Sequence, residues 1–247
     1  MAERAVIVGA SSGVGRALAA ELARRGFDLV LAARDERDLA SVASDIETRH
    51  RTRAHVCVVD LDSPTFDARE FCQVCCDRLG EVRAVFLTAG MIDDRDVGPA
   101  EPEVTARLIR VNYSSIVELV AELARVFELR GSGTLVTFSS IAAAAPRRRN
   151  PVYSSTKAAV EVYCRGLRHY FRDSEVVVQT YALGYVDTAM TFGQKLLFPI
   201  ASPAEIARHV ADNLHRDRGR VYLPRFWALV VLVLRHLPWS LYKRLSF

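Results

Sequence analysis

The chain has 247 residues, of which half are hydrophobic and a quarter are charged, as in a soluble globular protein. Its formal net charge of +4 is too small to demand a nucleic-acid partner, although it permits anionic ligands or a lipid surface. The length is sufficient to bury a substantial core in one large α/β domain or two small ones.

The N-terminus and the cysteines indicate a reducing compartment. Residues 5–8 already read as a buried strand, so no signal peptide is expected. The cysteines are odd in number and show no disulfide pattern; they are Cys57, Cys72, Cys75, Cys76 and Cys164. Three of them are spaced like metal ligands, but they fall in a helical pattern without a nearby His. We therefore expect reduced thiols packed in a helix, no metal site and a cytoplasmic protein.

Apolar runs alternate with helical patterns along the chain. The predicted strands are residues 4–9, 28–33, 54–59, 83–88, 133–139, 175–182 and 220–223. The predicted helices are residues 13–25, 36–50, 67–79, 103–130, 151–172 and 203–216. Strands that are apolar on both faces and separated by helices are typical of a parallel sheet covered on both sides. We therefore predict an α/β fold with a doubly wound parallel sheet of about seven strands, in a single domain over residues 1–224.

Residues 225–247 depart from this alternation and form an apolar and basic tail of the same domain. An uninterrupted apolar run at residues 226–234 lies between Arg225 and Arg235. The aromatic and basic residues that follow are Trp239, Tyr242, Lys243 and Arg244. Nine apolar residues are too few to span a bilayer, which needs about 20. The tail is either a helix packed on the domain or on another subunit, or an interfacial anchor on the cytoplasmic membrane.

The first predicted strand runs into a glycine-rich turn that opens the first helix. Glycines permit positive φ angles and a close approach of the backbone, and a helix N-terminus offers free N–H groups to a pyrophosphate. The residues predicted to form this phosphate-binding turn are Gly9, Ser11, Ser12, Gly13, Val14 and Gly15. Their GxxxGxG spacing differs from the GxGxxG of other dinucleotide-binding folds. A tight turn without any ligand is the alternative interpretation.

The end of the second predicted strand is expected to discriminate between the two nicotinamide dinucleotides. A carboxylate there would accept a hydrogen bond from the ribose 2′-hydroxyl, but the sequence has Ala33 followed by Arg34. This leaves room and positive charge for a 2′-phosphate, which favours NADPH over NADH. Asp60 and Leu61, at the end of the third strand, are predicted to meet the adenine edge, and Asp62 is expected to cap the following helix.

Tyr153 and Lys157 are four residues apart at the start of a predicted helix, so their side chains share one face. An ammonium beside a phenol stabilises the phenolate and lowers its pKa, as a general acid/base near neutral pH requires. Ser140 precedes this pair by thirteen positions. A YxxxK pair alone often arises by chance, but in this order after a phosphate-binding turn it strongly indicates catalysis.

These motifs together resemble the short-chain dehydrogenase/reductase family over residues 4–223, which implies a Rossmann-type sheet. Thr88-Ala89-Gly90 is similar to the family's Asn-Ala-Gly turn after the fourth strand, and Leu183-Gly184 stands where the family has Pro-Gly. The other matching residues are Asn112, Ser140, Tyr153 and Lys157 at the catalytic positions, and Val186 and Thr188 near the nicotinamide carboxamide. The missing Pro removes no reactive group.

The resemblance implies hydride transfer from NADPH to a ketone, with a proton relay. Tyr153 would donate its proton to the carbonyl oxygen, which Ser140 would bind and orient. Lys157 would lower the pKa of Tyr153, bind the nicotinamide ribose and pass protons through a water held by Asn112. An ordinary helix-interior amide is the alternative for Asn112. A redox-sensing NADPH-binding protein is the non-enzymatic alternative for the chain, and it predicts a broken catalytic set.

Two segments are similar to the reductases of decaprenylphosphoryl-2-keto-ribose, which complete the epimerisation of decaprenylphosphoryl-ribose to the arabinose donor of cell-wall arabinan. They are residues 146–151, which include Arg147, Arg148 and Arg149, and residues 232–245 of the tail. This resemblance implies a polyprenyl-phosphate keto-sugar as substrate and a flavin-dependent oxidase as functional partner. One or two of the arginines would face the phosphate. The alternatives are a solvated loop, and another lipid ketone such as a sterol, a retinoid or a 3-keto lipid, which would not need the arginines.

The two longest predicted helices, residues 103–130 and 151–172, carry apolar stripes. In the family that the chain resembles, the equivalent pair commonly packs against another subunit, which implies a homodimer or homotetramer. Burial of the same stripes against the sheet is the alternative.

Overall fold

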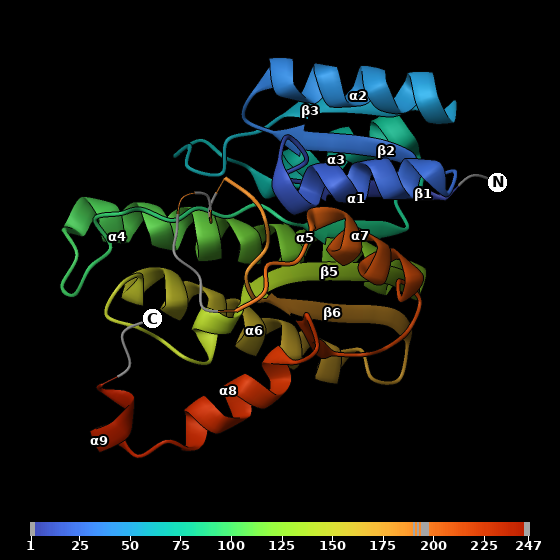
Figure 1. Cartoon of the computed structure of the whole chain (residues 1–247). Helices are drawn as coiled ribbons and strands as arrows, with labels where there is room; N and C mark the ends of the chain where they lie inside the picture. Colours follow the sequence, from blue (N-terminus) through green and yellow to red (C-terminus); the bar gives the residue numbers. More distant parts are fainter. Residues whose placement is uncertain (1–2, 190, 192, 194–197, 245–247) are drawn as a thin grey trace.

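The computed structural model describes residues 3–189, 191, 193 and 198–244. They form a seven-stranded sheet with the order β3-β2-β1-β4-β5-β6-β7, in which every neighbouring pair is parallel (Figure 1). The strands are β1 (Arg4–Val8), β2 (Asp28–Ala33), β3 (Ala54–Val58), β4 (Ala84–Leu87), β5 (Ser132–Ser140), β6 (Glu175–Leu183) and β7 (Arg220–Leu223). The order reverses between β1 and β4, so the predicted doubly wound fold is confirmed.

Helices cover both faces of this sheet, which explains why its central strands are apolar throughout. Leu18 and Ile206 belong to the buried cluster on one face, and Leu119 and Val160 belong to the cluster on the other. The helices on the first face are α1 (Gly13–Arg24), α2 (Glu36–His50) and α7 (Pro203–Asp212); those on the second are α3 (Ala68–Leu79), α5 (Ser115–Arg130) and α6 (Pro151–Tyr170).

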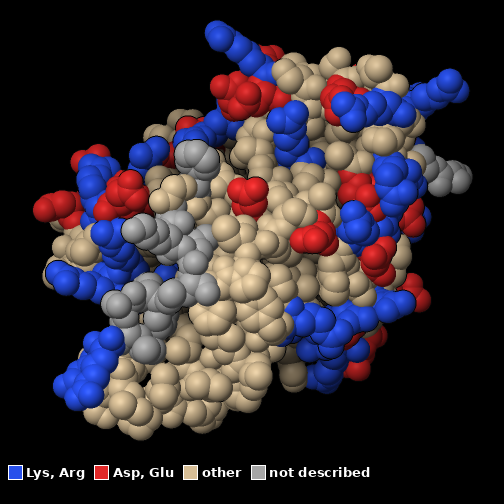
Figure 2. All heavy atoms as spheres, in the orientation of Figure 1, with Lys and Arg blue, Asp and Glu red and all other residues tan. Residues whose placement is uncertain are grey.

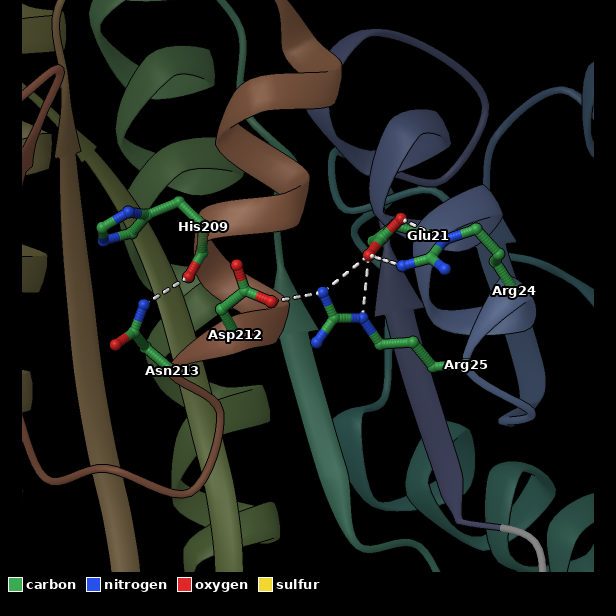
Figure 3. A network of polar contacts seen from close by, with 6 residues as sticks. All are labelled: Glu21, Arg24, Arg25, His209, Asp212 and Asn213. Atoms are coloured by element: carbon green, nitrogen blue, oxygen red, sulfur yellow. Dashed lines mark hydrogen bonds and ion pairs between the residues drawn. The ribbon is translucent and has the colours of Figure 1, made fainter.

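α1 and α7 lie side by side on the first face (Figure 1). Arg25, which follows α1, forms ion pairs with Glu21 and with Asp212 of α7, each with an N–O distance of 2.6 Å (Figure 3). A hydrogen bond from Arg24 is the main cause that holds the pKa of Glu21 at about 2. Because exposed ion pairs contribute at most about 1 kcal/mol, this network mainly orients the two helices.

The helix predicted over residues 103–130 is continuous but contains a π-helical turn. α4 (Pro102–Ile109) leads into the π turn η1 (Arg110–Ser114), and α5 follows directly. A π turn widens the helix by one residue and is frequent at functional sites. This turn carries Asn112, one of the predicted catalytic residues.

Half of the residues in the predicted apolar stripes are buried within the chain. The stripes consist of Val111, Val117, Leu119, Val120, Leu123, Val160, Val162 and Leu167. Leu119, Val120 and Leu123 of α5 and Val160 of α6 belong to the core on the second face of the sheet. Val162 of α6 remains exposed. The alternative of packing against the sheet therefore holds for the four buried residues, and the homodimer or homotetramer stays a prediction.

The cysteines are free thiols, as expected, and most of them are buried. Cys72, Cys75 and Cys76 lie on α3, and Cys57 lies on the neighbouring strand β3. Burial is the largest cause that raises the pKa of Cys72 to about 12, so this thiol stays protonated and unreactive at neutral pH. These residues serve as small apolar side chains of the core.

The tail is helical, as predicted, and extends beyond β7 along the lower side of the view in Figure 1. It consists of α8 (Trp227–His236) and the short α9 (Trp239–Tyr242). Trp227 is buried against Tyr185 with ring centroids 5.3 Å apart, and Val231 is buried in the same cluster. Within the described ranges, no helix combines the length and the apolar character needed to cross a bilayer.

Candidate active site

A cavity of about 700 Å³ opens at the carboxyl ends of the strands, where the strand order reverses. Ligands of open α/β sheets bind at this position, and cavities of this size hold small molecules or cofactors. All of the predicted cofactor-binding residues line it: Gly9, Ser11, Ser12, Gly13, Val14, Gly15, Arg34, Asp60, Leu61, Ala89, Gly90, Tyr153, Lys157, Gly184, Val186 and Thr188. Ser140 lines it as well, whereas Asn112 does not.

The turn after β1 has no room for a side chain at two of its glycines. Gly9 has a φ of +94°, and a Cβ added there would lie 2.6 Å from the backbone nitrogen of Ala89. At Gly15, an added Cβ would lie 2.1 Å from the carbonyl oxygen of Gly9. Ser12 is the N-cap residue of α1, yet its side chain makes no capping hydrogen bond. The first N–H groups of α1 therefore stay available at the cavity wall and fit a dinucleotide pyrophosphate.

The end of β2 places a positive charge at the cavity wall, as the sequence predicted. Arg34 is exposed and lines the cavity together with Asp38, which was not predicted. Asp35 between them caps α2, because its carboxylate accepts hydrogen bonds from the N–H groups of Arg37 and Asp38 at 2.9 and 3.1 Å. No carboxylate stands at Ala33, the last residue of the strand.

Asp60 and Leu61 line the cavity beyond β3, where the adenine edge is expected. The capping role predicted for Asp62 is wrong. Asp67 caps α3, since it accepts hydrogen bonds from two N–H groups of the first turn. Asp62 lies too far before that turn to reach it, and instead pairs with Arg107 of α4 at 2.7 Å.

The loop between β5 and α6 brings Ser140 beside the first turn of the helix that carries Tyr153 and Lys157. The Ser140 hydroxyl accepts a hydrogen bond from the N–H of Ala142 at 3.2 Å, and it lies near enough to the Tyr153 phenol to lower the pKa of that group. The Nζ atom of Lys157 lies 5.9 Å from the centre of the Tyr153 ring and donates a hydrogen bond to the carbonyl oxygen of Phe138 at 3.1 Å. All three predicted catalytic side chains thus meet at one point of the cavity wall.

The pKa of Tyr153 is raised, which is opposite to the predicted direction. Burial is the largest cause and outweighs the hydrogen bond with Ser140 and the positive charge of Arg147, both of which lower this pKa. Burial also lowers the pKa of Lys157 to about 8, so that its ammonium is lost as the pH rises through that value. The raised pKa keeps the phenol protonated at neutral pH, which is the form that donates a proton.

Asn112 forms a two-point clamp on the turn after β4. It is fully buried, and its Nδ2 donates to the carbonyl oxygen of Met91 at 2.9 Å while its Oδ1 accepts from the N–H of Met91 at 2.8 Å. The clamp holds Gly90 against Lys157, where an added Cβ would lie 3.0 Å from Nζ. Both polar groups of the amide are engaged in this contact, and the water-holding role of Asn112 stays a prediction.

Asp96 positions the catalytic helix and was missed by the sequence analysis. Its fully buried carboxylate accepts hydrogen bonds from the N–H groups of Val152 and Tyr153 at 3.1 and 2.9 Å. The local N-cap residue of α6, Asn150, makes no side-chain capping bond. Asp96 therefore caps α6 from a loop 56 residues before Val152, and no local sequence signal indicates such a cap.

The loop after β6 forms the remaining wall of the cavity. Gly184 allows α8 to pack against it, because a Cβ added there would lie 1.9 Å from Nε1 of Trp227. The hydroxyl of Thr191 donates to the carbonyl oxygen of Val186 and accepts from the N–H of Thr188 at 3.2 Å. Thr191 lines the cavity too and was not predicted.

A dinucleotide-binding oxidoreductase is the class of protein that this arrangement defines, because a glycine turn with free helix N–H groups and a buried phenol near a lysine open onto one cavity. The model of the short chain dehydrogenase family matches residues 3–195. The chain therefore belongs to the short-chain dehydrogenase/reductase family, and the protein is an oxidoreductase that uses a nicotinamide dinucleotide.

Three curated relatives match between 77% and 97% of the chain. An uncharacterised oxidoreductase of Mycobacterium tuberculosis is 28% identical over 242 residues, which cover 97% of this chain and 96% of that protein. The very-long-chain 3-oxoacyl-CoA reductase-A of Danio rerio is 26% identical over 92% of this chain and 73% of its own length. The human 17-beta-hydroxysteroid dehydrogenase type 3 is 30% identical over 77% of this chain and 61% of its own length.

Solved structures confirm the fold. A short-chain dehydrogenase from Sphingobium yanoikuyae in complex with NADPH superposes with a TM-score of 0.83. It is 25% identical, and the match covers 99% of this chain and 96% of that one. A 7beta-hydroxysteroid dehydrogenase reaches a TM-score of 0.85 over 98% of this chain and 95% of that one at 20% identity, which supports the fold alone.

Proposed function

We propose that the protein is an NADPH-dependent ketoreductase. NADPH, when bound, supplies the hydride. The glycine turn would hold its pyrophosphate, Arg34 the 2′-phosphate and Lys157 the nicotinamide ribose. The support for NADPH is the positive charge of Arg34 at the cavity wall, with Ala33 where a ribose-binding carboxylate would stand. The relative from Sphingobium yanoikuyae also binds NADPH.

The residues at the catalytic end of the cavity provide the proton and hold the substrate oxygen. Tyr153 donates its phenolic proton to the carbonyl oxygen of the ketone. The Ser140 hydroxyl hydrogen-bonds the same oxygen as negative charge develops on it. Lys157 supplies a buried positive charge beside the phenol, Asn112 holds the neighbouring turn, and Asp96 fixes the first turn of α6.

Replacing Arg34 by Ala tests the cofactor. We expect Arg34→Ala to weaken NADPH binding about ten- to a hundredfold, because one charge-assisted contact to the 2′-phosphate is lost, and to leave NADH binding nearly unchanged. Titration of nucleotide fluorescence measures both dissociation constants. Arg37→Ala, an exposed arginine on the first turn of α2, is the matched control. Equal losses for the two nucleotides, or a loss in the control alone, would place the 2′-phosphate elsewhere.

For the substrate, we propose a polyprenyl-phosphate-linked 2-keto-pentose. The observation that supports it is the position of Arg147: burial raises the pKa of both Tyr153 and the tail residue Tyr242, and the positive charge of Arg147 opposes this rise at both phenols. When the ketone of such a substrate reaches Tyr153, the phosphate of the same molecule would therefore be near the guanidinium of Arg147. The product would be the arabinose epimer of decaprenylphosphoryl-ribose, a precursor of cell-wall arabinan.

A neutral lipid ketone is the second candidate substrate. One relative carries a name that specifies such chemistry, the 17-beta-hydroxysteroid dehydrogenase type 3. The apolar surface of the tail would suit a sterol, a retinoid or a 3-keto lipid equally well. Only the arginines of residues 147–149 favour the phosphate-bearing substrate.

An NADPH-oxidation assay separates the two candidates. We expect decaprenylphosphoryl-2-keto-ribose to be reduced with a kcat/KM at least about tenfold above that of a 3-keto sterol, corresponding to one charged contact. Arg147→Gln should remove that advantage, because its effect on Tyr153 changes both rates alike, whereas loss of the phosphate contact lowers only the rate with the keto-sugar. Arg165→Gln, an exposed arginine on α6, is the matched control. Equal turnover of both ketones, unaffected by Arg147→Gln, would reject the keto-sugar.

The proposed keto-sugar substrate implies an enzyme that supplies it. A flavin-dependent oxidase that forms the keto-sugar is proposed as the supplier, either in a complex or by handover of the lipid. We also propose a cytoplasmic homodimer or homotetramer in which exposed residues of α6 such as Val162 contribute to the subunit contact.

A further inference from the structure

Helix α8 presents apolar side chains in every direction. Its inner side places Trp227 and Val231 in the core, and both are almost fully buried. Its outer side carries Leu229, Leu232 and Val233, which are 67%, 55% and 53% exposed. Their spacing of three and four residues places them on one face. A helix that is apolar all round is expected to be covered on both sides, and here one side faces outward.

This outer face continues over α9 into one apolar surface, which we call the tail surface. The exposed apolar residues that form it are Phe226, Leu229, Leu232, Val233, Trp239 and Leu241. Trp239 is 72% exposed, and its ring stacks on that of Tyr242 with centroids 6.1 Å apart. Trp and Tyr are the residues that favour the boundary between lipid headgroups and acyl chains.

The charged residues of the tail itself have a single sign. Residues 224–247 contain no Asp or Glu. Arg225 stands at the start of α8, Arg235 at its end, and Lys243 and Arg244 follow α9. Figure 2 shows the surface over α8 as a continuous area without acidic side chains, with basic side chains at its α9 end. An apolar strip bordered by cations matches a layer of anionic lipid headgroups above acyl chains.

The tail also contacts the catalytic loop. The Tyr242 hydroxyl donates a hydrogen bond to the carbonyl oxygen of Pro146, which precedes the arginines of residues 147–149. The charge of Arg147 acts on both Tyr242 and Tyr153, so this loop lies near the tail and near the phenol of the site. The loop and the start of α6, residues 141–157, contain no acidic residue either.

A second copy of the chain fits this surface less well than a bilayer does. A symmetric dimer formed through the tail surface would align two α8 helices either parallel or antiparallel. Because both ends of α8 carry arginine, each arrangement would bring Arg225 or Arg235 of one copy against a basic residue of the other. Anionic lipid neutralises the same groups.

We propose that the tail surface docks the protein on an anionic phospholipid bilayer. α8 lies along the membrane plane, its outer face enters the acyl boundary, and the basic residues contact the headgroups. The docking rests on the surface alone. Its purpose rests on the proposed function: a lipid-linked ketone in the bilayer reaches Tyr153 past the loop of residues 146–149 without leaving the membrane entirely.

Flotation of the full chain with vesicles tests the docking. We expect the protein to float with vesicles of equal parts phosphatidylglycerol and phosphatidylcholine, and much less with phosphatidylcholine alone. The triple variant Leu229→Gln, Leu232→Gln, Val233→Gln should bind at least about tenfold more weakly. The matched control is Leu129→Gln with Val58→Gln, which removes two exposed apolar side chains elsewhere and should float like the wild type.

Three single substitutions of basic residues test the docking independently if the triple variant does not fold. Arg235→Gln, Lys243→Gln and Arg244→Gln should each weaken binding to the anionic vesicles about fivefold, because each basic residue near an anionic surface contributes to adsorption. Thermal unfolding checks that every variant is folded. Equal flotation of the wild type and the folded triple variant, or no flotation of the wild type, would overturn the docking. A dimer that the triple variant abolishes, without vesicle binding by the wild type, would assign the surface to a second copy and overturn it too.

The docking and the proposed function fail in different ways. Vesicle binding without reduction of any lipid ketone would keep the docking and reject the substrate class. If the docking and the substrate assignment both hold, the triple variant should reduce the detergent-dispersed keto-sugar at the wild-type rate. It should reduce the same lipid in vesicles more slowly than the wild type does. Equal rates of the two proteins in vesicles would show that the tail surface does not deliver the substrate.

Discussion

Replacing Tyr153 by Phe is expected to remove nearly all ketone reduction while NADPH binding persists. The substitution deletes only the phenolic oxygen, so the ring keeps its place on α6 and the lining of the cofactor cavity is nearly unchanged. Loss of a positioned general acid lowers kcat about a hundred- to ten-thousandfold. Ser140 cannot take over, because a serine hydroxyl is a far weaker acid than a phenol. Steady-state kcat and the NADPH dissociation constant, measured on the same preparation, check this result.

The control for this substitution is on the same helix. Tyr170 is exposed at the last residue of α6, and its hydroxyl donates a hydrogen bond to Glu128. Tyr170→Phe removes a phenol of the same size outside the cavity, and its kcat should equal that of the wild type. Near-normal turnover by Tyr153→Phe would show that the proton comes from another group and would refute the catalytic assignment.

Replacing Gly15 by Ala is expected to cost both stability and cofactor binding. The added Cβ would lie 2.1 Å from the carbonyl oxygen of Gly9 and 2.5 Å from Oγ1 of Thr88. The turn must shift to relieve this overlap, at a cost of about 1–3 kcal/mol, which corresponds to a decrease in Tm of about 2–12 °C. The same shift moves the N–H groups that fit the pyrophosphate, so the NADPH dissociation constant should rise at least about tenfold.

Gly166→Ala is the matched control, because Gly166 also lies inside a helix. A Cβ added there meets no atom within 4 Å. Ala is favoured over Gly in a helix by about 0.8–1 kcal/mol, so the Tm should rise by about 2–4 °C with unchanged NADPH binding. If Gly15→Ala raised the Tm as Gly166→Ala does, the close contact between Gly15 and Gly9 would be refuted.

The sheet was predictable because its strands are covered on both faces. Because both faces are buried, successive residues of a strand are apolar, as in β1. This continuous apolar run distinguishes each strand in the sequence from the amphipathic pattern of the neighbouring helices. β2, which spans Asp28–Ala33, has the predicted bounds. The α7 helix is shorter than predicted and ends at Asp212, where the chain leaves the helix at Asn213 although the apolar pattern continues to Leu214.

The cavity lining was predictable for a related reason. Most of its residues lie at the end of a strand or just after it, and parallel strands bring those ends to one edge of the sheet. Contacts between distant segments had no such signal. The clamp between Asn112 and Met91 and the cap of α6 by Asp96 depend on where the loop after β4 folds back. The same holds for the contact between Tyr242 and Pro146.

The sequence by itself determined the order of the elements, the phosphate-binding turn and the chemical groups available for catalysis, because these depend on short-range pattern and spacing. Tertiary structure alone decided the direction of the Tyr153 pKa shift, since desolvation depends on every group that encloses the phenol. It also decided which side of α8 is buried and which faces outward. A helix that is apolar on all sides carries no information about the side that packs, and only the position of Trp227 against Gly184 selects it.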